Sequence, residues 1–438
     1  MDSLLNLSIR IDPSQAGTYF TLPFHVPEGI ESITLKYGYD RRPAKEQALD
    51  GGLFTGREEV NIVDLGLIDP RGVQVGASGS DKVEIEVGET RATPGYQPTR
   101  IVPGRWQILV GAYKVAPEGV TVGYEIRLRR KARRLLRGDL HVHSVGSDGV
   151  HTVEELAWKA RRHGLDFLAI TDHNQFAPAD SLPRVDGVTM IPGVEWTHYQ
   201  GHASFLGVDR PYDGCFATNS VEEARTRFAS ARERGALIVV DHPFDPLCGF
   251  HFPLDALPWD CIEVWNGPMR ECNLQSVGMW HQLLASGAKI PACGGSDYHR
   301  DTPFLFLGGP TTCVFAESAG ASDILAALRA GHAFITFAPD GPGLELAAGD
   351  AIMGDTVNWQ ELKEVRIKAQ GLLAGDVVRV ATAQETAVLF TAPVDGDVEL
   401  TYALASPGFA RAEILRSFLP GLPMLPALLS NPIYFAGP

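Results

Sequence analysis

The chain has 438 residues, of which 45% are hydrophobic and 21% charged, and this composition is that of a globular protein rather than a disordered one. Its 38 basic and 53 acidic residues give a formal net charge of −15, which argues against long nucleic acid as a partner, because proteins that track phosphates usually carry a basic surface. A chain of this length is expected to form two or three domains.

Residues 1–130 are predicted to form an N-terminal β-sandwich. Short, partly alternating apolar segments are separated by Gly, Pro and Asp turns at the spacing typical of this architecture; they are GTYFTLPFHV, ESITLKYGYD, VNIVDLGLID, KVEIEVGE, RWQILVGAY and VGYEIRLRR. His25 is the only histidine in this region, so no catalytic group of residues is expected there.

One basic run, RLRRKARRLLR (Arg127–Arg137), follows the last of these segments. We interpret it as a solvated linker or helix face rather than a nucleic-acid contact.

Residues 137–337 show a different pattern. Apolar runs that suit buried parallel strands, such as FLAITD, VTMIPGVE, ASFLGV, ALIVVD, CIEVW and IPACGGSD, alternate with helical stretches. Helix starts are indicated by Thr152 with Glu155, by Ser220 with Glu223, and by Ser322 ahead of a stop at Gly331. About seven strand–helix units predict an α/β barrel of TIM type or a smaller variant.

Residues 338–438 are predicted to form a small C-terminal β-rich domain. The segments EVRIKAQG, DVVRVATA, TAVLFTAPV and DVELTYALA resemble strands, and the Pro-rich, apolar end FLPGLPMLPALLSNPIYFAGP is expected to pack against the body.

The six cysteines are scattered without a C-x-x-C pair, which favours a reducing compartment. The start MDSLLNLSIRID has no signal-peptide pattern, and no segment approaches 18 uninterrupted apolar residues. We therefore expect a cytoplasmic protein with no membrane partner.

Ionisable side chains gather at the ends of the apolar runs, where a parallel-strand barrel places its chemistry. Five such ends carry histidine, aspartate or glutamate: His141 and His143 with Asp148 a turn later, Asp172 and His173, Glu195 with His198 and His202, Asp241 and His242, and Asp297 and His299. A single histidine at a strand end is more often structural, but burying so many ionisable groups together is costly unless a cation neutralises the carboxylates.

Divalent metal ions supply such a cation, and imidazole with carboxylate suits zinc, manganese or iron. Nine of these side chains are candidate ligands, namely those named above other than Asp172, His198 and Asp241. Nine ligands exceed the needs of one tetrahedral ion but suit two or three ions.

The segments DLHVHSVGSDG, AITDHN, PGVEWTHYQGH, DHP and GSDYH resemble, in type, order and spacing, the motifs of the PHP (polymerase and histidinol phosphatase) metal-dependent phosphoesterases over roughly residues 138–336. ATPGYQP, PGRWQILVGAY and SNPIYF are similar to the carbaryl-hydrolase-like (CehA/McbA-type) branch. The resemblance implies a distorted (β/α)7 TIM-like barrel with a flanking β domain on each side.

The resemblance also implies a ligand assignment. His141, His143, Glu195 and Asp297 would hold one metal, and Glu195 would bridge to a second metal held by His202 and His242. Asp148, His173 and His299 would hold a third metal, or the second if occupancy is partial. Some family members have histidine at the position of Asp148.

Other site residues are left open by the sequence. The leaving group can take a proton from His198, Tyr298 or a metal-bound water. Asp139, Asp172 and Asp241 either orient ligand imidazoles or cap strand ends. Arg300 and Arg270 are candidates for phosphate recognition or are surface residues, while Asn174 and Asn266 suit an uncharged substrate oxygen.

The leading hypothesis is hydrolysis of a phosphate mono- or diester of a small molecule by a hydroxide that two or three divalent ions activate. The alternative enzyme is a carbamate or carboxylic ester hydrolase that uses the same metals. A non-catalytic scaffold is a third hypothesis, although no ligand position is empty.

Overall fold

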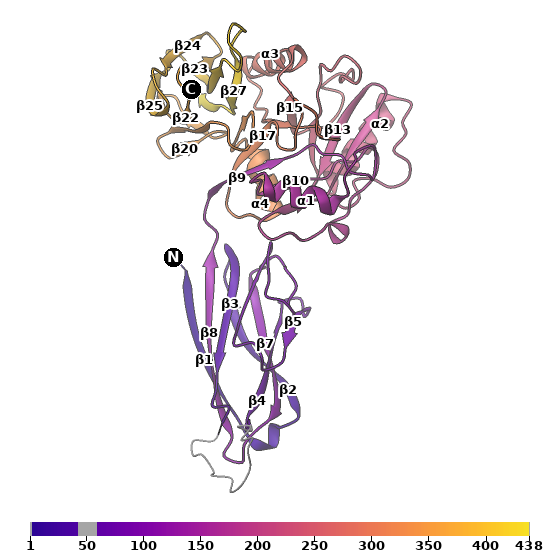
Figure 1. Cartoon of the computed structure of the whole chain (residues 1–438), viewed down its shortest axis with the longest axis vertical. Coiled ribbons are helices and arrows are strands. Elements are labelled where there is room, and N and C mark those ends of the chain that lie inside the picture. The colour runs from indigo at the N-terminus through magenta and orange to yellow at the C-terminus, as the bar shows by residue number, and fades with distance from the viewer. Residues whose placement is uncertain (1, 43–58, 438) are drawn as a thin grey trace. The chain divides into compact units, whose positions relative to one another are not determined.

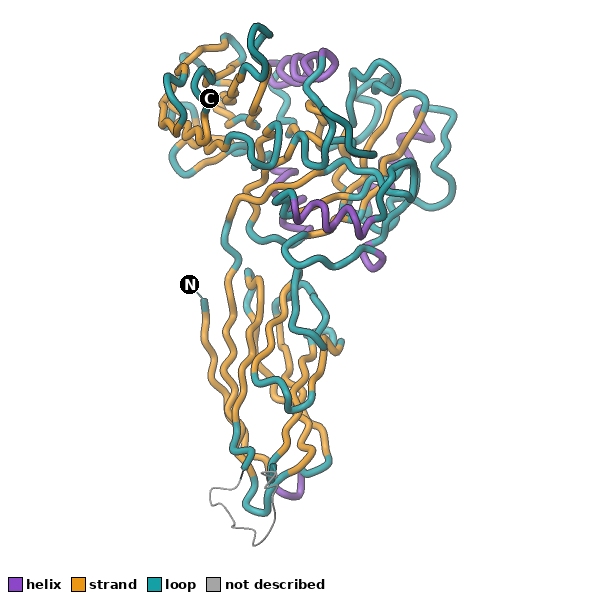
Figure 2. The backbone as a smooth tube through the Cα atoms, viewed as in Figure 1, coloured by secondary structure: helices purple, strands orange, loops and turns teal. Residues whose placement is uncertain are grey.

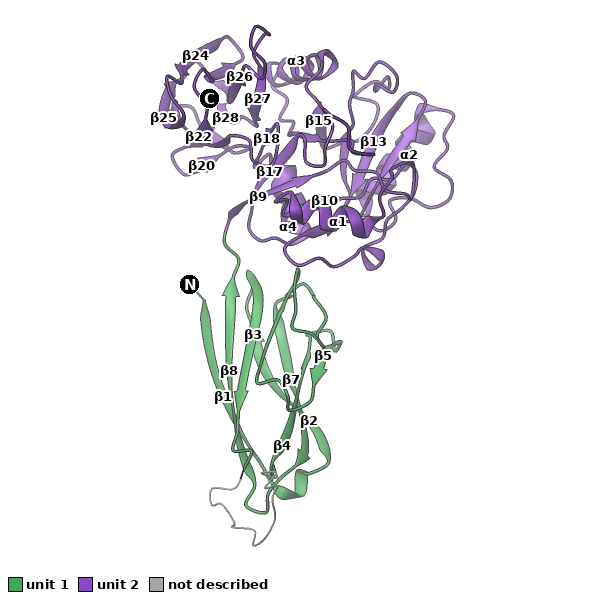
Figure 3. Ribbon diagram, in the orientation of Figure 1, with its two compact units in different colours: residues 1–132 green, residues 133–438 purple. Residues whose placement is uncertain are grey.

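The computed structural model describes residues 2–42 and 59–437 (Figure 1). Strands make up most of its regular structure (Figure 2), and the α-helices of the described residues all lie after residue 150. The chain divides into two compact units, Met1–Ala132 and Arg133–Pro438 (Figure 3). The second unit contains both the predicted barrel region and the predicted C-terminal domain, so their separation from each other stays a prediction.

Two four-stranded antiparallel sheets form the first unit. One has the order β1 (Ser3–Ile11), β8 (Val120–Arg130), β3 (Ile30–Gly38), β6 (Glu84–Gly88), and the other the order β2 (Thr18–Val26), β7 (Gly104–Lys114), β4 (Ile62–Ile68), β5 (Gln74–Ser78). Along β8, buried and more exposed residues alternate, because successive side chains of a strand point to opposite faces. The inward residues of both sheets share one apolar core around Trp106.

The observed first unit differs from the sequence predictions at the basic run and contains two strands that were not predicted. The basic run is neither a simple linker nor a helix face, because its first residues end β8 and its last ones lie in β9 (Arg134–Asp139). The strands β1 and β5 are not among the predicted segments.

The second unit is mixed α/β with several sheets. A five-stranded sheet has the order β12 (Gly193–His198), β13 (Gly201–Leu206), β14 (Leu237–Val240), β15 (Cys261–Asn266), β16 (Ala292–Gly295). The last three strands are parallel, as predicted, but β13 is antiparallel to both of its neighbours.

A larger sheet begins with parallel strands β11 (Thr189–Ile191), β10 (Phe167–Ala169) and β9. It continues antiparallel through β17 (Thr311–Ala316), β18 (Ala333–Thr336), β27 (Leu425–Ser430), β26 (Gly408–Arg416), β23 (Val377–Thr382) and β24 (Thr386–Thr391), with β28 (Ile433–Ala436) and β21 (Thr356–Asn358) at its side. The C-terminal strands β27 and β28 are mostly buried, so the later part of the Pro-rich end packs on the body as predicted, whereas Phe418, Leu419 and Leu422 at its start are exposed.

A four-stranded sheet completes the second unit, in the order β20 (Ala351–Ile352), β19 (Gly343–Ala348), β22 (Glu364–Leu372), β25 (Gly396–Ala403). It shares an apolar core with β23 and β26. The four strands predicted after residue 338 correspond to β22, β23, β24 and β25.

Four α-helices lie within the described residues, fewer than the seven strand–helix units predicted: α1 (Val153–Arg162), α2 (Val221–Glu233), α3 (Glu271–Ala285) and α4 (Ala321–Ala330). The Thr152–Glu155 capping box begins α1, and Ser220 caps α2. The α4 helix starts one residue before Ser322, after Gly320, and ends at Gly331 with a left-handed φ of 78°. The overcount arises because β12 and β13 form a hairpin with no helix between them, and because, in these fully described stretches, no α-helix lies between β10 and β11 or between β14 and β15.

Two isolated parallel bridges connect the sheets around the ends of these strands. Val142, beyond β9, pairs with Tyr298, beyond β16, and His173, beyond β10, pairs with Glu195 on β12. The two sheets therefore meet where the predicted ligands are located.

No helix in the described parts of the chain is long and apolar enough to cross a membrane. All six cysteines lie in described segments and are free thiols.

Candidate metal centre

Two short extended segments, one around Val142 and one around Tyr298, orient the first predicted ligands through the alternation of their side chains. The Tyr298 carbonyl accepts a hydrogen bond from the His143 N–H at 2.9 Å, and the Tyr298 N–H donates to the His141 carbonyl at 3.3 Å. Side chains of consecutive extended residues point to opposite sides. Val142 and Tyr298 therefore enter an apolar cluster with Leu156, while their neighbours in sequence turn toward one another.

Three of these neighbours, His141, His143 and Asp297, form the first group together with Glu195. The Nε2 atom of His141 lies 3.6 Å from Glu195 Oε2 and 3.5 Å from Asp297 Oδ1, and the Nε2 atom of His143 lies 3.4 and 3.1 Å from the same two oxygens. Two ligands bound to one tetrahedral ion at about 2.1 Å are about 3.4 Å apart. All four nitrogen–oxygen distances are close to that spacing.

Three atoms of this group test whether a cation fits. Nε2 of His141, Nε2 of His143 and Oε2 of Glu195 are buried and make no well-aligned hydrogen bond within the described residues, and the closest ion-pair contact of Oε2 is Nδ1 of His173 at 2.7 Å. A buried polar group without a partner costs about 1–3 kcal/mol, and these three point to a common space. The donor set and its orphaned atoms fit a bound divalent ion.

Glu195 also contacts the second group through its other oxygen. Oε1 lies 2.7 Å from His202 Nδ1 and 3.3 Å from His242 Nε2. The side chain of Glu195 is fully buried between the two groups, the position required of a carboxylate that bridges two ions.

A third group lies at the open side. The exposed Asp148 places Oδ1 at 3.1 Å from His299 Nε2 and at 3.7 Å from His173 Nε2. The His143 ring lies between the other two rings, with centroids 4.3 Å from His173 and 4.1 Å from His299. Ligand atoms of all four residues lie within 4.8 Å of one another. The structure thus brings all nine predicted ligands together, and the number of ions that they hold stays a prediction.

Backbone strain is concentrated at the same place. Among the described residues other than glycine, positive φ values occur at Asn174 (53°), His242 (27°) and Asp297 (51°). All three follow directly after predicted ligand-bearing strands. Such conformations cost about 1–3 kcal/mol each and tend to persist at functional sites.

The electrostatics of the cluster follow from burial and from its mixture of charges. Burial opposes protonation of His141, but the carboxylates of Asp297, Glu263 and Glu195 outweigh it and raise the pKa of that imidazole well above its ordinary value. Burial alone would raise the pKa of Glu195, yet His141 and the neighbouring histidines hold it well below the usual range. Burial lowers the pKa of His143.

The three predicted partner aspartates act as caps. Asp139 accepts from the N–H groups of His141, Ser296 and Gly308, and burial raises its pKa to about 6. Asp172 accepts from Ser144 and Ser147, and Asp241 from Ser204. None of these contacts is to an imidazole, which favours the strand-cap alternative.

The imidazole contacts come instead from residues that the sequence did not indicate. Glu263, a glutamate inside the apolar run CIEVW on β15, places Oε1 3.2 Å from His141 Nδ1. Cys248 places Sγ 3.7 Å from His242 Nδ1 and donates to Asp245 Oδ1 at 3.3 Å. A charged residue within a fully buried strand was the available signal for Glu263; Cys248 had none.

His198 and Tyr298 are not directed into the cluster. The Nε2 atom of His198 contacts the Thr218 carbonyl at 3.1 Å, and its Nδ1 accepts from the Gln200 N–H at 3.1 Å, so both ring nitrogens are occupied by backbone groups. The ring of Tyr298 packs on the α1 side, beside His151 and Lys159. A proton-donor role for either residue stays a prediction that this geometry disfavours.

The two arginine candidates differ in their surroundings. Arg300 is exposed on the segment after His299. Arg270 donates to Asn266 Oδ1 at 3.2 Å, and the Asn266 amide donates to Asp297 Oδ2 at 3.3 Å. Asn174 is bound to both the N–H and the carbonyl of Thr197, so of the four polar candidates Arg270 and Asn266 are the two connected to the cluster.

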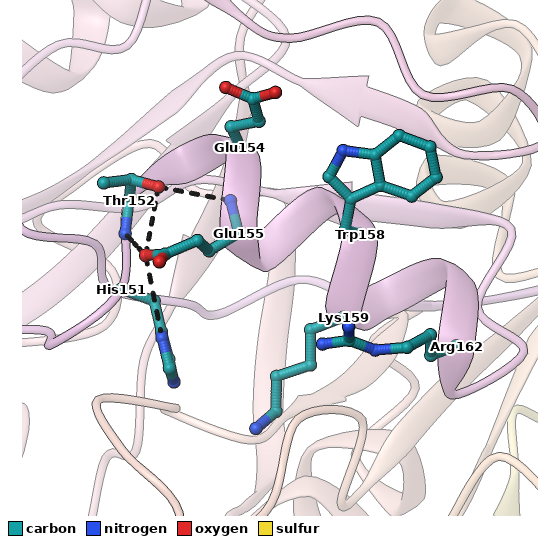
Figure 4. A pocket seen from close by; sticks show the side chains of 7 residues that line it. All are labelled: His151, Thr152, Glu154, Glu155, Trp158, Lys159 and Arg162. Carbon is teal, nitrogen blue, oxygen red and sulfur yellow. Dashed lines mark hydrogen bonds and ion pairs between the residues drawn. The ribbon is translucent and has the colours of Figure 1, made fainter.

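A separate pocket lies on the outer side of α1. It is lined by His151, Thr152, Glu154, Glu155, Trp158, Lys159 and Arg162 (Figure 4). Its residues pair among themselves through the capping box and the contact of His151 with Glu155, and none of them is a predicted ligand.

Comparison with known proteins locates a related domain in the same region. The PHP domain model matches residues 139–255. The chain is 29% identical over 128 residues to the DNA polymerase/3'-5' exonuclease PolX of Bacillus subtilis and 36% identical over 81 residues to a 5'-3' exoribonuclease of Haemophilus influenzae. These matches cover 28% and 17% of this chain, and only 21% and 30% of the relatives' own lengths.

Among solved structures, the chain is similar to a two-domain protein of Bacteroides vulgatus that contains a predicted PHP-like metal-dependent phosphoesterase. The two are 19% identical with a TM-score of 0.40, and the match covers 65% of this chain and 90% of that one.

Proposed function

We propose that the protein is a metal-dependent hydrolase that cleaves phosphate mono- or diesters of a small molecule at the cluster of nine ligands. The observation that carries the proposal is the convergence of His141, His143, Glu195 and Asp297, with three buried atoms that make no hydrogen bond. The PHP match over residues 139–255 supports it, and the names of the two curated relatives denote nucleases, whose substrates are phosphodiesters.

The proposal includes two or three divalent ions, with zinc, manganese and iron all compatible with the donor set. Bound there, such ions would supply an activated water and stabilise the charge that develops on the ester oxygens. His141, His143, Glu195 and Asp297 would hold the first ion, and Glu195, His202 and His242 the second. Asp148, His173 and His299 would hold a third ion at the more exposed edge.

Residues beside the ligands would then bind and orient the substrate. Arg270 has a half-exposed guanidinium that is fixed by Asn266 and by Asp245, whose Oδ2 lies 3.6 Å away. Guanidinium groups suit phosphate oxygens because their N–H donors form a planar fork. We assign anion recognition to Arg270 in preference to Arg300 for this reason.

We also propose that β9, β10 and β12–β16 together form the distorted seven-stranded barrel expected from the sequence. The two bridges, Val142 with Tyr298 and His173 with Glu195, support this arrangement because they join the sheets at both edges.

A substrate screen with added zinc, manganese or iron tests the function. Chromogenic phosphomonoesters, phosphodiesters and aryl carbamates should be compared for wild-type protein and His143→Ala. We expect phosphoester turnover that falls at least about a hundredfold in the variant, because even partners behind a ligand change activity by 10–100-fold.

Turnover of carbamates alone would overturn the phosphoester assignment and favour the alternative hydrolase. Less than one equivalent of bound metal per chain, with no activity after metal addition, would favour the scaffold hypothesis instead.

A further inference from the structure

Glu263 on β15 contacts ligands of both predicted metal positions without facing either position itself. We propose that Glu263 is a positioning residue that couples the two positions, so that its loss weakens metal binding at both. This inference rests on the proposed function, because it concerns the same ligands.

The contacts of Glu263 reach two other segments directly, and a third through Asn266 of the same strand. Its Oε1 atom lies 3.2 Å from Nδ1 of His141, and its Oε2 atom accepts from the His242 N–H at 3.0 Å and from the Asn266 side-chain amide at 3.0 Å. The same amide nitrogen lies 3.3 Å from Asp297 Oδ2. One buried carboxylate, 2% exposed, thus contacts His141 of the first group and His242 of the second, and is linked to Asp297 of the first group through Asn266.

The contact with His141 fixes which nitrogen faces the cluster. A carboxylate only accepts hydrogen bonds, so Nδ1 of His141 must carry the proton. In the neutral imidazole, the form that binds a metal, the lone pair is then on Nε2. This buried atom makes no hydrogen bond within the described residues and lies 3.5–3.6 Å from the carboxylates of Asp297 and Glu195. Histidine ligands of metals are commonly oriented by such a carboxylate behind the ring.

The contact with His242 holds a strained backbone. His242 has a φ of 27°, a conformation that persists only when its surroundings fix it. The Oε2 atom of Glu263 binds the N–H of this residue and thereby helps to keep the His242 ring directed at Glu195 Oε1, 3.3 Å away.

A glycine on the neighbouring strand makes room for the pair. A Cβ atom at Gly295 would lie 2.4 Å from the His141 Cβ and 2.7 Å from Glu263 Oε1. Any larger residue there would displace the imidazole or the carboxylate. The absence of a side chain at Gly295 is therefore matched to the His141–Glu263 contact.

The test is calorimetric titration of metal-free protein with zinc, for wild type and Glu263→Gln. Glutamine offers one acceptor and one amide group, so it cannot accept from His141, His242 and Asn266 as the carboxylate does. We expect affinity to fall by about 10–100-fold at both positions. The matched control is Glu413→Gln, an equally buried glutamate of the second unit whose partners are Arg379 and Arg411; it should bind zinc as the wild type does.

A folded Glu263→Gln variant with wild-type affinity, or with only one position weakened, would overturn the coupling role. If the variant does not fold, histidine NMR of the zinc-loaded wild type decides instead. The proposal requires His141 to carry its proton on Nδ1, and ligation through Nδ1 would contradict it.

The two proposals fail in different ways. Wild-type protein that binds less than one equivalent of zinc would overturn both the proposed function and this inference. Wild-type protein that binds zinc while Glu263→Gln binds it equally well would overturn the inference alone.

Discussion

Two groups of buried charged side chains in the second unit differ in how their charges are stabilised. In the C-terminal strands, the buried Glu413 pairs with both Arg379 and Arg411, and the Arg411 guanidinium lies over the Trp280 ring, 5.1 Å from its centroid. In the candidate metal centre, imidazole and carboxylate atoms converge at 2.7–3.7 Å, yet three of them make no hydrogen bond within the described residues.

The difference favours a structural role for the first group and a metal-binding role for the second. The C-terminal group supplies its own cations, so the Glu413 carboxylate is paired with Arg379 and Arg411 when the chain folds. Of the buried side-chain atoms of these three residues, only Nε of Arg411, whose guanidinium lies over Trp280, makes no hydrogen bond within the described residues. The metal centre leaves lone pairs directed at a shared space, and that arrangement is stable only if a cation or protons occupy it.

The largest effect on folding should come from the C-terminal group of Glu413, Arg379 and Arg411. Glu413→Gln leaves two arginines facing a neutral partner, one of them buried, and breaking a buried pair from one side costs about 3–5 kcal/mol. We expect a loss of that size in the free energy of unfolding, measured by urea denaturation. An unchanged zinc stoichiometry is part of the prediction, and a loss of zinc would show that the two groups are coupled.

At the candidate metal centre, the free energy of unfolding should depend on bound metal rather than on ion pairs within the protein. Zinc at a hundred times its dissociation constant should raise the free energy of unfolding by about 2.7 kcal/mol per site, since it binds only the folded chain. The gain is measured as the shift of the denaturation midpoint between chelated and zinc-loaded protein. His143→Ala should lose most of this gain, and a shift as large as that of the wild type would argue against His143 as a ligand.

The sequence predicted which ionisable side chains converge better than it predicted which residues contact them from behind. His141 and His143, like Asp297 and His299, are two residues apart at strand ends, and the side-chain period of a strand brings such pairs to one side. Glu263 was missed because it lies inside an apolar run, and its role depends on the strand that packs beside it. Cys248 was missed because a loop folds back to place it behind His242.

The fold shows the same limit. Alternating strands of the first unit were largely predicted, whereas the apolar runs that form β12 and β13 gave no sign that they pair as a hairpin. Residues 409–414 of β26 are buried throughout, so that strand lacks the alternation by which strands were recognised.

Low pH should reduce the stability that the pairing of Glu413 with Arg379 and Arg411 contributes. Burial raises the pKa of Glu413, but Arg411 and Arg379 outweigh burial and lower it. A carboxylate with a lowered pKa contributes stability above the ordinary value of 4.5, and this contribution is lost as the pH falls through the folded-state pKa. In chelated protein, the stability difference between wild type and Glu413→Gln should therefore shrink below pH 4.5. A difference that stays constant to pH 3 would contradict the pairing.

The smallest effect should come from a residue close to the metal centre that plays no part in it. Thr152 caps α1 directly after the loop that carries Asp148, and replacing a capping threonine with alanine costs about 1 kcal/mol. That loop is held independently, because the Val150 N–H donates to the His299 carbonyl at 3.0 Å and the Gly149 N–H to the Ser144 carbonyl at 2.9 Å. Thr152→Ala should thus lower the free energy of unfolding by about this amount and leave the zinc titration unchanged. A weaker zinc affinity would mean that the third ligand group depends on the start of α1, and that the metal centre is less self-contained than its backbone contacts indicate.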